Sequence, residues 1–162
     1  KRHDIFLKMA KSLIKKYPEK KLIFIIAGDG PQKSTIIDLI EKSNLVKNVN
    51  MLGHIDQIPE LLTATDIFVL SSDSKEGVPQ AVMQALFMGK NVVATNSGST
   101  EDLFMGDNFQ LVETQSEDDL VKGVSFYLNQ SVSKKNRALI DDKFSSKFMV
   151  SRILKIYYSL LR

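Results

Sequence analysis

The stretch DIFVLSSDSKEGVPQAVMQALFMG, residues 66–89, decides how this chain is expected to fold. Its apolar run Ile67 to Leu70 has the length of a strand and ends in small polar residues. After a polar loop, Pro79 opens a helical pattern, and proline suits the first helical position because its missing N–H would have no partner there. The first free N–H groups of that helix should therefore face the end of the strand, where open α/β sheets bind ligands and helix N-termini favour anions.

Two side chains bracket this predicted helix start. Glu76 precedes it, and Gln84 lies inside the helix, about 7–8 Å along the axis from Pro79 at roughly 1.5 Å per residue. A diphosphate at the helix start would then have a hydrogen-bonding side chain on each side, one for a sugar and one for a ribose. The alternative is a plain strand–helix unit with a solvated Glu76 in its loop.

Residues 76–95, EGVPQAVMQALFMGKNVVAT, resemble the donor-binding motif of the retaining, GT-B-fold group 1 glycosyltransferases. The resemblance implies that Glu76 is the catalytic-site carboxylate and contacts hydroxyls of the donor sugar. Gln84 stands where the family usually has a second Glu that binds the ribose, so it can still donate or accept a hydrogen bond but carries no charge. Asn91 replaces a usual proline.

The same resemblance implies a diphosphate site. The backbone amides near Gly77 and Val78 are expected to bind the donor diphosphate together with Lys1. In the family, a loop with an Arg and a Lys precedes the first helix, and Lys1 or Arg2 would be the tail of that loop.

Two further loops are expected near the nucleotide. Gly28 and Gly30 lie in the segment AGDGP, which is similar to a loop of the group 1 enzymes that lies near the nucleotide. Lys33 stands where a dinucleotide-binding fingerprint needs a third glycine, so this is not a Rossmann cofactor loop. His54 follows a short strand and is expected either to contact the base or to be an ordinary surface histidine.

Five short apolar runs alternate with helical patterns, and they predict an α/β fold with a doubly wound, Rossmann-like parallel sheet flanked by helices. The expected strands are residues 21–27, 49–53, 67–70, 91–95 and 109–112. The first is a continuous apolar run of the type that is buried on both faces of a parallel sheet. By resemblance, residues 1–162 are the C-terminal donor-binding half of a two-domain GT-B enzyme, without its first strand and its N-terminal acceptor domain.

Helical patterns cover residues 4–17, 133–144 and 146–162, and Ser116 has the signature of a helix cap. The last helix carries a broad apolar stripe through Met149, Ile153 and Tyr157. Two readings stay open: the stripe docks on the sheet of this domain, or part of it packs on the missing half.

Composition restricts the remaining possibilities. The chain has 162 residues, 43% of them hydrophobic, and neither a secretory signal nor a run of transmembrane length. It has no Cys and two His, which excludes thiolate sites and a histidine-built metal centre. Residues 1–21 hold eight basic residues against two acidic ones. This end is expected either to contact anionic lipid or a phosphorylated ligand, or to be a solvated helix face, and the absence of interleaved aromatics argues against nucleic acid.

The expected function is therefore a nucleotide-sugar donor-binding domain of a hexosyltransferase of bacterial surface polysaccharide or glycoconjugate synthesis, inactive alone, with no separate cofactor or metal. The resemblance places it in the cytoplasm, peripheral to the inner face of the membrane in the complete enzyme. Half of a sugar-nucleotide epimerase is a rival within the fold, but only Glu76 is placed for its acid–base chemistry. A flavodoxin-like binding module is a rival from another class, yet neither Asp29 nor Asp73 belongs to an acidic pair.

Overall fold

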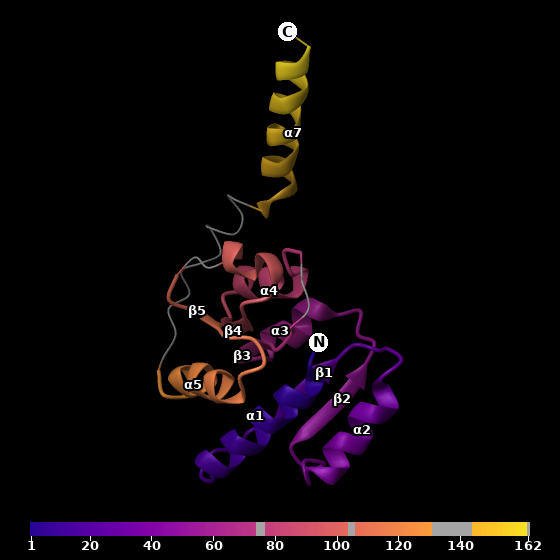
Figure 1. Cartoon of the computed structure of the whole chain (residues 1–162), viewed down its shortest axis with the longest axis vertical. Helices are drawn as coiled ribbons and strands as arrows, with labels where there is room; N and C mark the ends of the chain where they lie inside the picture. Colours follow the sequence, from indigo (N-terminus) through magenta and orange to yellow (C-terminus); the bar gives the residue numbers. More distant parts are fainter. Residues whose placement is uncertain (74–76, 104–105, 131–143, 162) are drawn as a thin grey trace.

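A computed structural model describes residues 1–73, 77–103, 106–130 and 144–161. Within these residues the chain forms five strands, all in parallel pairs, with helices packed around them (Figure 1). The expected α/β fold with a parallel sheet flanked by helices is confirmed. The strands are divided between a three-stranded and a two-stranded sheet.

The three-stranded sheet has the order β3–β4–β5, with β3 at Ile67–Leu70, β4 at Asn91–Thr95 and β5 at Phe109–Val112. β4 lies in the middle and pairs in parallel with both neighbours. All five of its residues are buried, as expected of an apolar strand covered on both faces.

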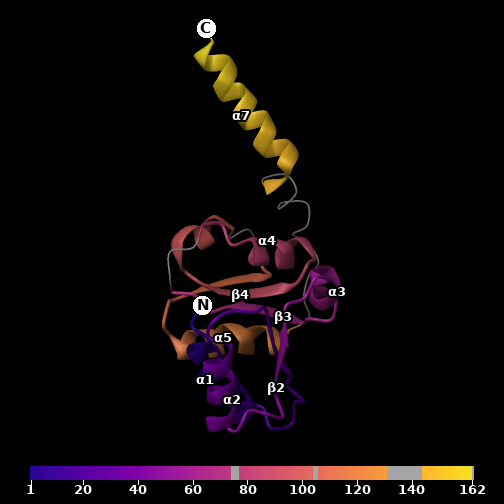
Figure 2. The ribbon, with the colours of Figure 1, turned by 90° about the vertical axis from the view of Figure 1, so that its right-hand side faces the viewer.

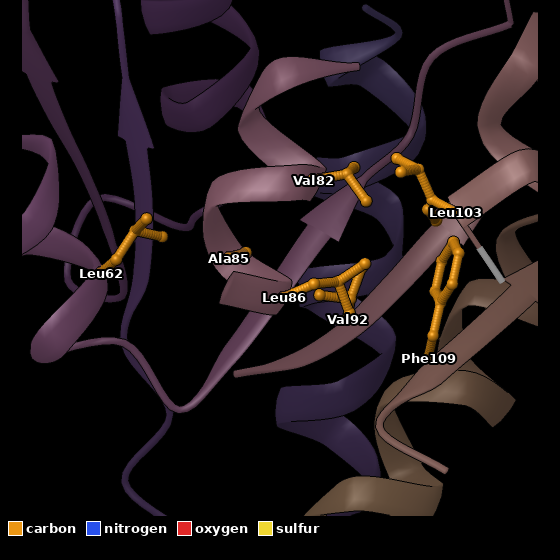
Figure 3. Packing of buried hydrophobic residues seen from close by; sticks show 8 residues of the cluster. Leu62, Val82, Ala85, Leu86, Val92, Leu103 and Phe109 are labelled. Atoms are coloured by element: carbon orange, nitrogen blue, oxygen red, sulfur yellow. The ribbon is translucent and has the colours of Figure 1, made fainter. Parts of the chain in front are cut away.

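Helices cover both faces of this sheet. Figure 2 shows α4 (Gln80–Phe87) on one face and α5 (Glu117–Leu128) on the other. Side chains of α3 (Ile58–Thr63), α4 and the sheet form one core, seen in Figure 3 with Leu62, Val82, Ala85, Leu86, Val92, Leu103 and Phe109 labelled. On the opposite face, α1 (His3–Lys16) and α5 bury a second core with Met9, Leu13, Val93, Leu120 and Val124.

The two-stranded sheet pairs β1 (Phe24–Ala27) with β2 (Val49–Gly53). Its inner face packs on α1 and on α2 (Lys33–Lys42), in a third core that includes Leu7, Ala10, Ile26, Ile36, Ile40 and Val49. The helix α1 therefore belongs to two cores at once and joins the two sheets.

The expectation that residues 21–27 are buried on both faces is wrong. The strand is limited to four residues, and their exposure alternates along it. Ile26 is 8% exposed on the helix-covered side, whereas Ile25 and, on β2, Leu52 are 39% and 44% exposed. Successive side chains of a strand point to opposite faces, and no described helix covers the outer face of this pair.

Local signals explain where the helices begin. Ser116 precedes α5, and its hydroxyl accepts a hydrogen bond from the N–H of Asp119, so the predicted cap is confirmed. Pro79 is the N-cap of α4 and not its first helical residue, so the helix begins one residue later than expected, at Gln80. After β4, the chain forms a 3₁₀ helix, η1 (Gly98–Leu103).

The last helix, α7 (Ser146–Leu160), projects away from the rest of the chain in Figures 1 and 2. None of its residues is buried; Met149 and Ile153 are 56% and 43% exposed. These two residues therefore do not dock on the domain's own sheet, which was one of the two expected arrangements. The other C-terminal helix expected, residues 133–144, falls almost wholly outside the described residues. Over the part of the chain that is described, no helix combines the length and apolarity needed to cross a membrane.

Candidate nucleotide-sugar site

The start of α1 lies against the carboxyl end of β3. The Ser71 hydroxyl donates to the carbonyl oxygens of Lys1 and Arg2, at 2.9 and 3.2 Å. Ser71 is itself buried, at 6% exposed. On the other side of β3, the buried Thr95 hydroxyl at the end of β4 donates to the carbonyls of Leu70 and Ser72. The strand end is therefore held between the first residues of the chain and the end of β4.

A charged cluster sits directly above this strand end. The guanidinium of Arg2 contacts Asp4 through Nε and Nη2, both at 2.9 Å, and Asp73 through Nη1 at 2.7 Å. Gln115, which follows β5, donates from Nε2 to the same Asp73 oxygen at 3.3 Å. Asp4 and then Asp73 hold the pKa of the Arg2 guanidinium above its usual range.

Two helix N-termini therefore lie at this edge of the sheet, and neither N-cap residue makes a side-chain capping hydrogen bond. In the first turn of α1, the carboxylate of Asp4 accepts from the Arg2 guanidinium, and this contact holds the pKa of Asp4 below its usual range. The N-cap of α4 is Pro79, which has no side-chain cap. The first turn of α1 carries the carboxylate of Asp4, whereas the first turn of α4 has no acidic residue, so of the two termini α4 is the more favourable to an external anion.

The residues before α4 suit such an anion. Gly77 is exposed, and a Cβ built on it would meet no atom of the described residues within 4 Å. Val78 is partly buried and packs its side chain against the core below α4, which fixes the position of its backbone. Gln84 is exposed, further along α4. The expected catalytic-site residue Glu76 lies outside the described residues.

The two nucleotide loops expected from sequence lie side by side at the ends of β1 and β2. The N–H of Gly28 donates to the carbonyl of Gly53 at 2.7 Å, which brings Gly28 and Gly30 next to the loop that begins with His54. Nothing lies within 4 Å of a Cβ built on either loop glycine. The imidazole of His54 is 77% exposed and contacts Asp56 at 3.0 Å.

The expected residues thus form two groups. Lys1 lies at the carboxyl end of β3, the strand that precedes α4, and Gly28, Gly30 and His54 lie together at the carboxyl ends of β1 and β2. In the described residues, no group of three or more His, Asp or Glu side chains is arranged to hold a metal ion. A cavity of about 410 Å³ between β5 and α5, lined by Gln110, Lys122 and Phe126 among others, includes none of the expected site residues.

Sequence reasoning missed the part played by Asp73. On the sequence alone this residue is considered only as a possible member of an acidic pair, whereas in the structure its carboxylate accepts hydrogen bonds from both Arg2 and Gln115. These partners are 71 and 42 positions away in the sequence, so no local pattern could have paired them. The available signal was a charged side chain at a strand end next to a strongly basic N-terminal segment.

Comparison with known proteins identifies the family to which this arrangement belongs. The family model described as "Glycosyl transferases group 1" matches residues 1–143. The O-antigen biosynthesis glycosyltransferase WclY of Escherichia coli is 26% identical over 145 residues, which cover 89% of this chain and 41% of that protein. The chain therefore spans less than half the length of this relative.

Solved structures agree in fold. S. aureus TarM, in a complex that contains UDP, superposes with a TM-score of 0.85 at 24% identity, covering 97% of this chain and 33% of that one. Anabaena HepE in complex with UDP also has a TM-score of 0.85, at 19% identity, covering 98% and 45%. The parallel sheets, the flanking helices and the family match lead to one conclusion: this chain belongs to the group 1 glycosyltransferases and has the Rossmann-like α/β fold of one half of a GT-B structure.

Proposed function

We propose that this chain is the nucleotide-sugar donor-binding part of a retaining hexosyltransferase of bacterial surface glycan synthesis. Two observations carry the proposal: the N-terminus of α4 has no side-chain cap, and Lys1 lies at the carboxyl end of β3, the strand that precedes α4. Support comes from the relative named for O-antigen biosynthesis and from two structural neighbours solved with UDP. The donor would be the only small molecule required, with no separate cofactor or metal.

Each expected residue has a role in the proposal. The amides of Gly77 and Val78, with Lys1, bind the diphosphate, because a helix N-terminus and an ammonium both favour negative charge. Glu76 contacts hydroxyls of the donor sugar, and Gln84 contacts the ribose. The loops with Gly28, Gly30 and His54 lie near the base.

The chemistry that follows is mostly electrostatic. When the sugar leaves the nucleotide, negative charge develops on the diphosphate, and fixed amides and a cation stabilise that charge without having to reorganise. Acceptor recognition would require a further domain, so we expect the 162-residue chain to bind nucleotide but to transfer no sugar. Titration calorimetry with UDP, GDP and ADP tests binding, and no heat with any of them at millimolar concentration would contradict the donor-site proposal.

Two variants test the assigned roles. Gln84→Ala should weaken the binding of the bare nucleoside diphosphate by about 0.5–1.5 kcal/mol, the value of one lost hydrogen bond. Glu76→Ala should leave that affinity unchanged and weaken only the nucleotide sugar. Gln130→Ala makes the same truncation at an exposed position beyond α5 and serves as the control. If the Gln84 and Glu76 variants respond alike to both ligands, the roles are wrongly assigned.

The same site would serve half of a sugar-nucleotide epimerase, which the binding experiment does not exclude. The two reactions differ in what the longer protein does with its donor. A transferase consumes the nucleotide sugar only with an acceptor and releases the nucleoside diphosphate, whereas an epimerase converts the sugar without an acceptor. Product analysis on the longer protein separates them.

The basic N-terminal face leads to a second expectation, of a peripheral position at the cytoplasmic face of a membrane. Lys8, Lys11 and Lys15 are all exposed on α1, away from its buried side. Basic residues near an anionic surface attract it, and salt screens the attraction. Co-sedimentation with phosphatidylglycerol vesicles should fall when these three lysines are replaced by Ala. Equal sedimentation of the two proteins would leave the lysines as a solvated face.

A further inference from the structure

The contacts of Arg2 suggest what this residue does at the site. All three nitrogens of its guanidinium donate to carboxylates: Nε and Nη2 to Asp4, and Nη1 to Asp73. The side chains of Arg2 and Asp73 are only 28% and 25% exposed, so the contact is largely shielded from solvent. A guanidinium held between two carboxylates has little remaining positive charge to offer a diphosphate.

Backbone conformation singles out the same place. Arg2 has φ 54° and ψ 51°, in the left-handed backbone region that residues other than glycine and asparagine rarely adopt. Gln115 also has a positive φ, of 61°. In the described part of the chain, three residues other than glycine have a positive φ, and two of them, Arg2 and Gln115, donate to the same oxygen of Asp73.

Such conformations persist where surrounding contacts hold them, and they gather at functional sites. Here the contacts join three parts of the chain: the residues before α1, the end of β3 and the turn after β5. Ser71 adds two hydrogen bonds to the carbonyls of Lys1 and Arg2. Asp73 is the residue on which these three parts converge.

We propose that Asp73 is a positioning residue for the diphosphate site, which it serves by tethering Arg2 and Gln115. Arg2 is then a tether and not a phosphate ligand, and the cation proposed for the diphosphate is the adjacent Lys1. The inference rests on the proposed nucleotide-sugar function. It assigns to Asp73 a role that its charge alone would not suggest, because a carboxylate close to a diphosphate repels it.

The two possible roles of Asp73 predict changes of opposite sign in the affinity for a diphosphate. If Asp73 acted only through its charge, Asp73→Asn would strengthen the binding of a diphosphate. If Asp73 is a tether, Asp73→Asn removes the charge that holds Arg2, and Arg2 remains paired with Asp4 alone, so diphosphate binding weakens. The opposite sign of the two effects makes the experiment decisive without a precise magnitude.

The experiment is calorimetry on the whole chain with UDP, uridine and inorganic pyrophosphate. We expect Asp73→Asn to lower the affinity for UDP and for pyrophosphate by about tenfold, the size of one charge-assisted hydrogen bond. The affinity for uridine should stay unchanged. Asp38→Asn removes the same charge from the exposed side of α2 and should change none of the three. UDP binding that is unchanged or tighter in Asp73→Asn overturns the proposal, and so does an equal weakening of UDP and uridine.

A second variant guards against misfolding. Arg2→Gly removes the tether, and glycine accepts the left-handed conformation without strain, so this protein should fold. It should weaken the binding of UDP as much as Asp73→Asn does. The double variant should bind UDP no more weakly than either single variant. Additive losses would overturn the tether, because they would show that Arg2 and Asp73 act separately. If the wild type binds no UDP, the proposed function itself fails and the inference falls with it; if the wild type binds and the variants match it, only the inference fails.

Discussion

The two sheets of this domain differ in how their faces are covered. β4 has helices on both faces, and all five of its residues are buried. The β1–β2 pair packs on α1 and α2 with one face, and Ile25 and Leu52 remain 39% and 44% exposed on the other. Both β1 and β4 read as apolar runs in the sequence, so hydrophobicity alone does not reveal whether a strand is covered on one face or two.

The largest expected difference comes from removing one leucine side chain in each sheet region. Leu86 on α4 is 1% exposed, and Leu86→Ala should lower the free energy of unfolding by about 2–5 kcal/mol, since it leaves a cavity. Leu52→Ala makes the same truncation on the open face and should cost no more than about 0.5 kcal/mol. Urea unfolding measures both. Similar losses would mean that the outer face of β1–β2 is covered in solution.

Glycine provides a second matched pair. A Cβ added at Gly123 in α5 would lie 2.7 Å from Cγ1 of Val93, so Gly123→Ala should destabilise the fold by about 1–3 kcal/mol. At Gly30, beyond β1, an added Cβ meets nothing, and Gly30→Ala should be neutral or stabilising. Thermal unfolding compares the two variants. The double variant with Val93→Ala should recover part of the Gly123 loss, and the absence of any recovery would place the strain elsewhere.

A smaller effect, of opposite sign, is expected at the start of β4. Asn91 is 3% exposed, and its Oδ1 has no hydrogen-bond partner among the residues that the structure describes. Since burying an unsatisfied acceptor is costly, Asn91→Val should raise the free energy of unfolding by about 1 kcal/mol. Chemical denaturation measures the change. A clear loss of stability would show that the Asn91 amide makes a contact in solution that this structure lacks.

The smallest effect on stability is expected in α7, none of whose residues is buried. Ile153 and Ile156 are 43% and 59% exposed, and replacing both by Asp should leave the unfolding free energy nearly unchanged. An exposed stripe of this kind promotes association, so the wild type should self-associate in sedimentation experiments and the variant should not. A monomeric wild type with slowly exchanging amides in residues 155–161 would contradict this prediction.

Much of the fold could be predicted because its signals are local. The strand–loop–helix pattern of residues 66–89, the Ser116 cap and the five apolar runs each depend on residues close together in the chain. The exposed face of β1 could not be predicted, because it depends on which helices pack where. The family motif located the candidate site, but the Arg2–Asp73 pair joins positions 71 residues apart and has no local signature.

The most direct test of the donor site is an NMR titration of ¹⁵N-labelled protein with inorganic pyrophosphate and then with UDP. Pyrophosphate should shift the amides of Gly77, Val78 and Gln80, at the entrance to α4. UDP should shift these and, through its base, also Gly28, Gly30 and His54. Pyrophosphate shifts confined to the β1–β2 loops, or no shift at the α4 entrance with either ligand, would contradict a diphosphate site at the carboxyl end of β3.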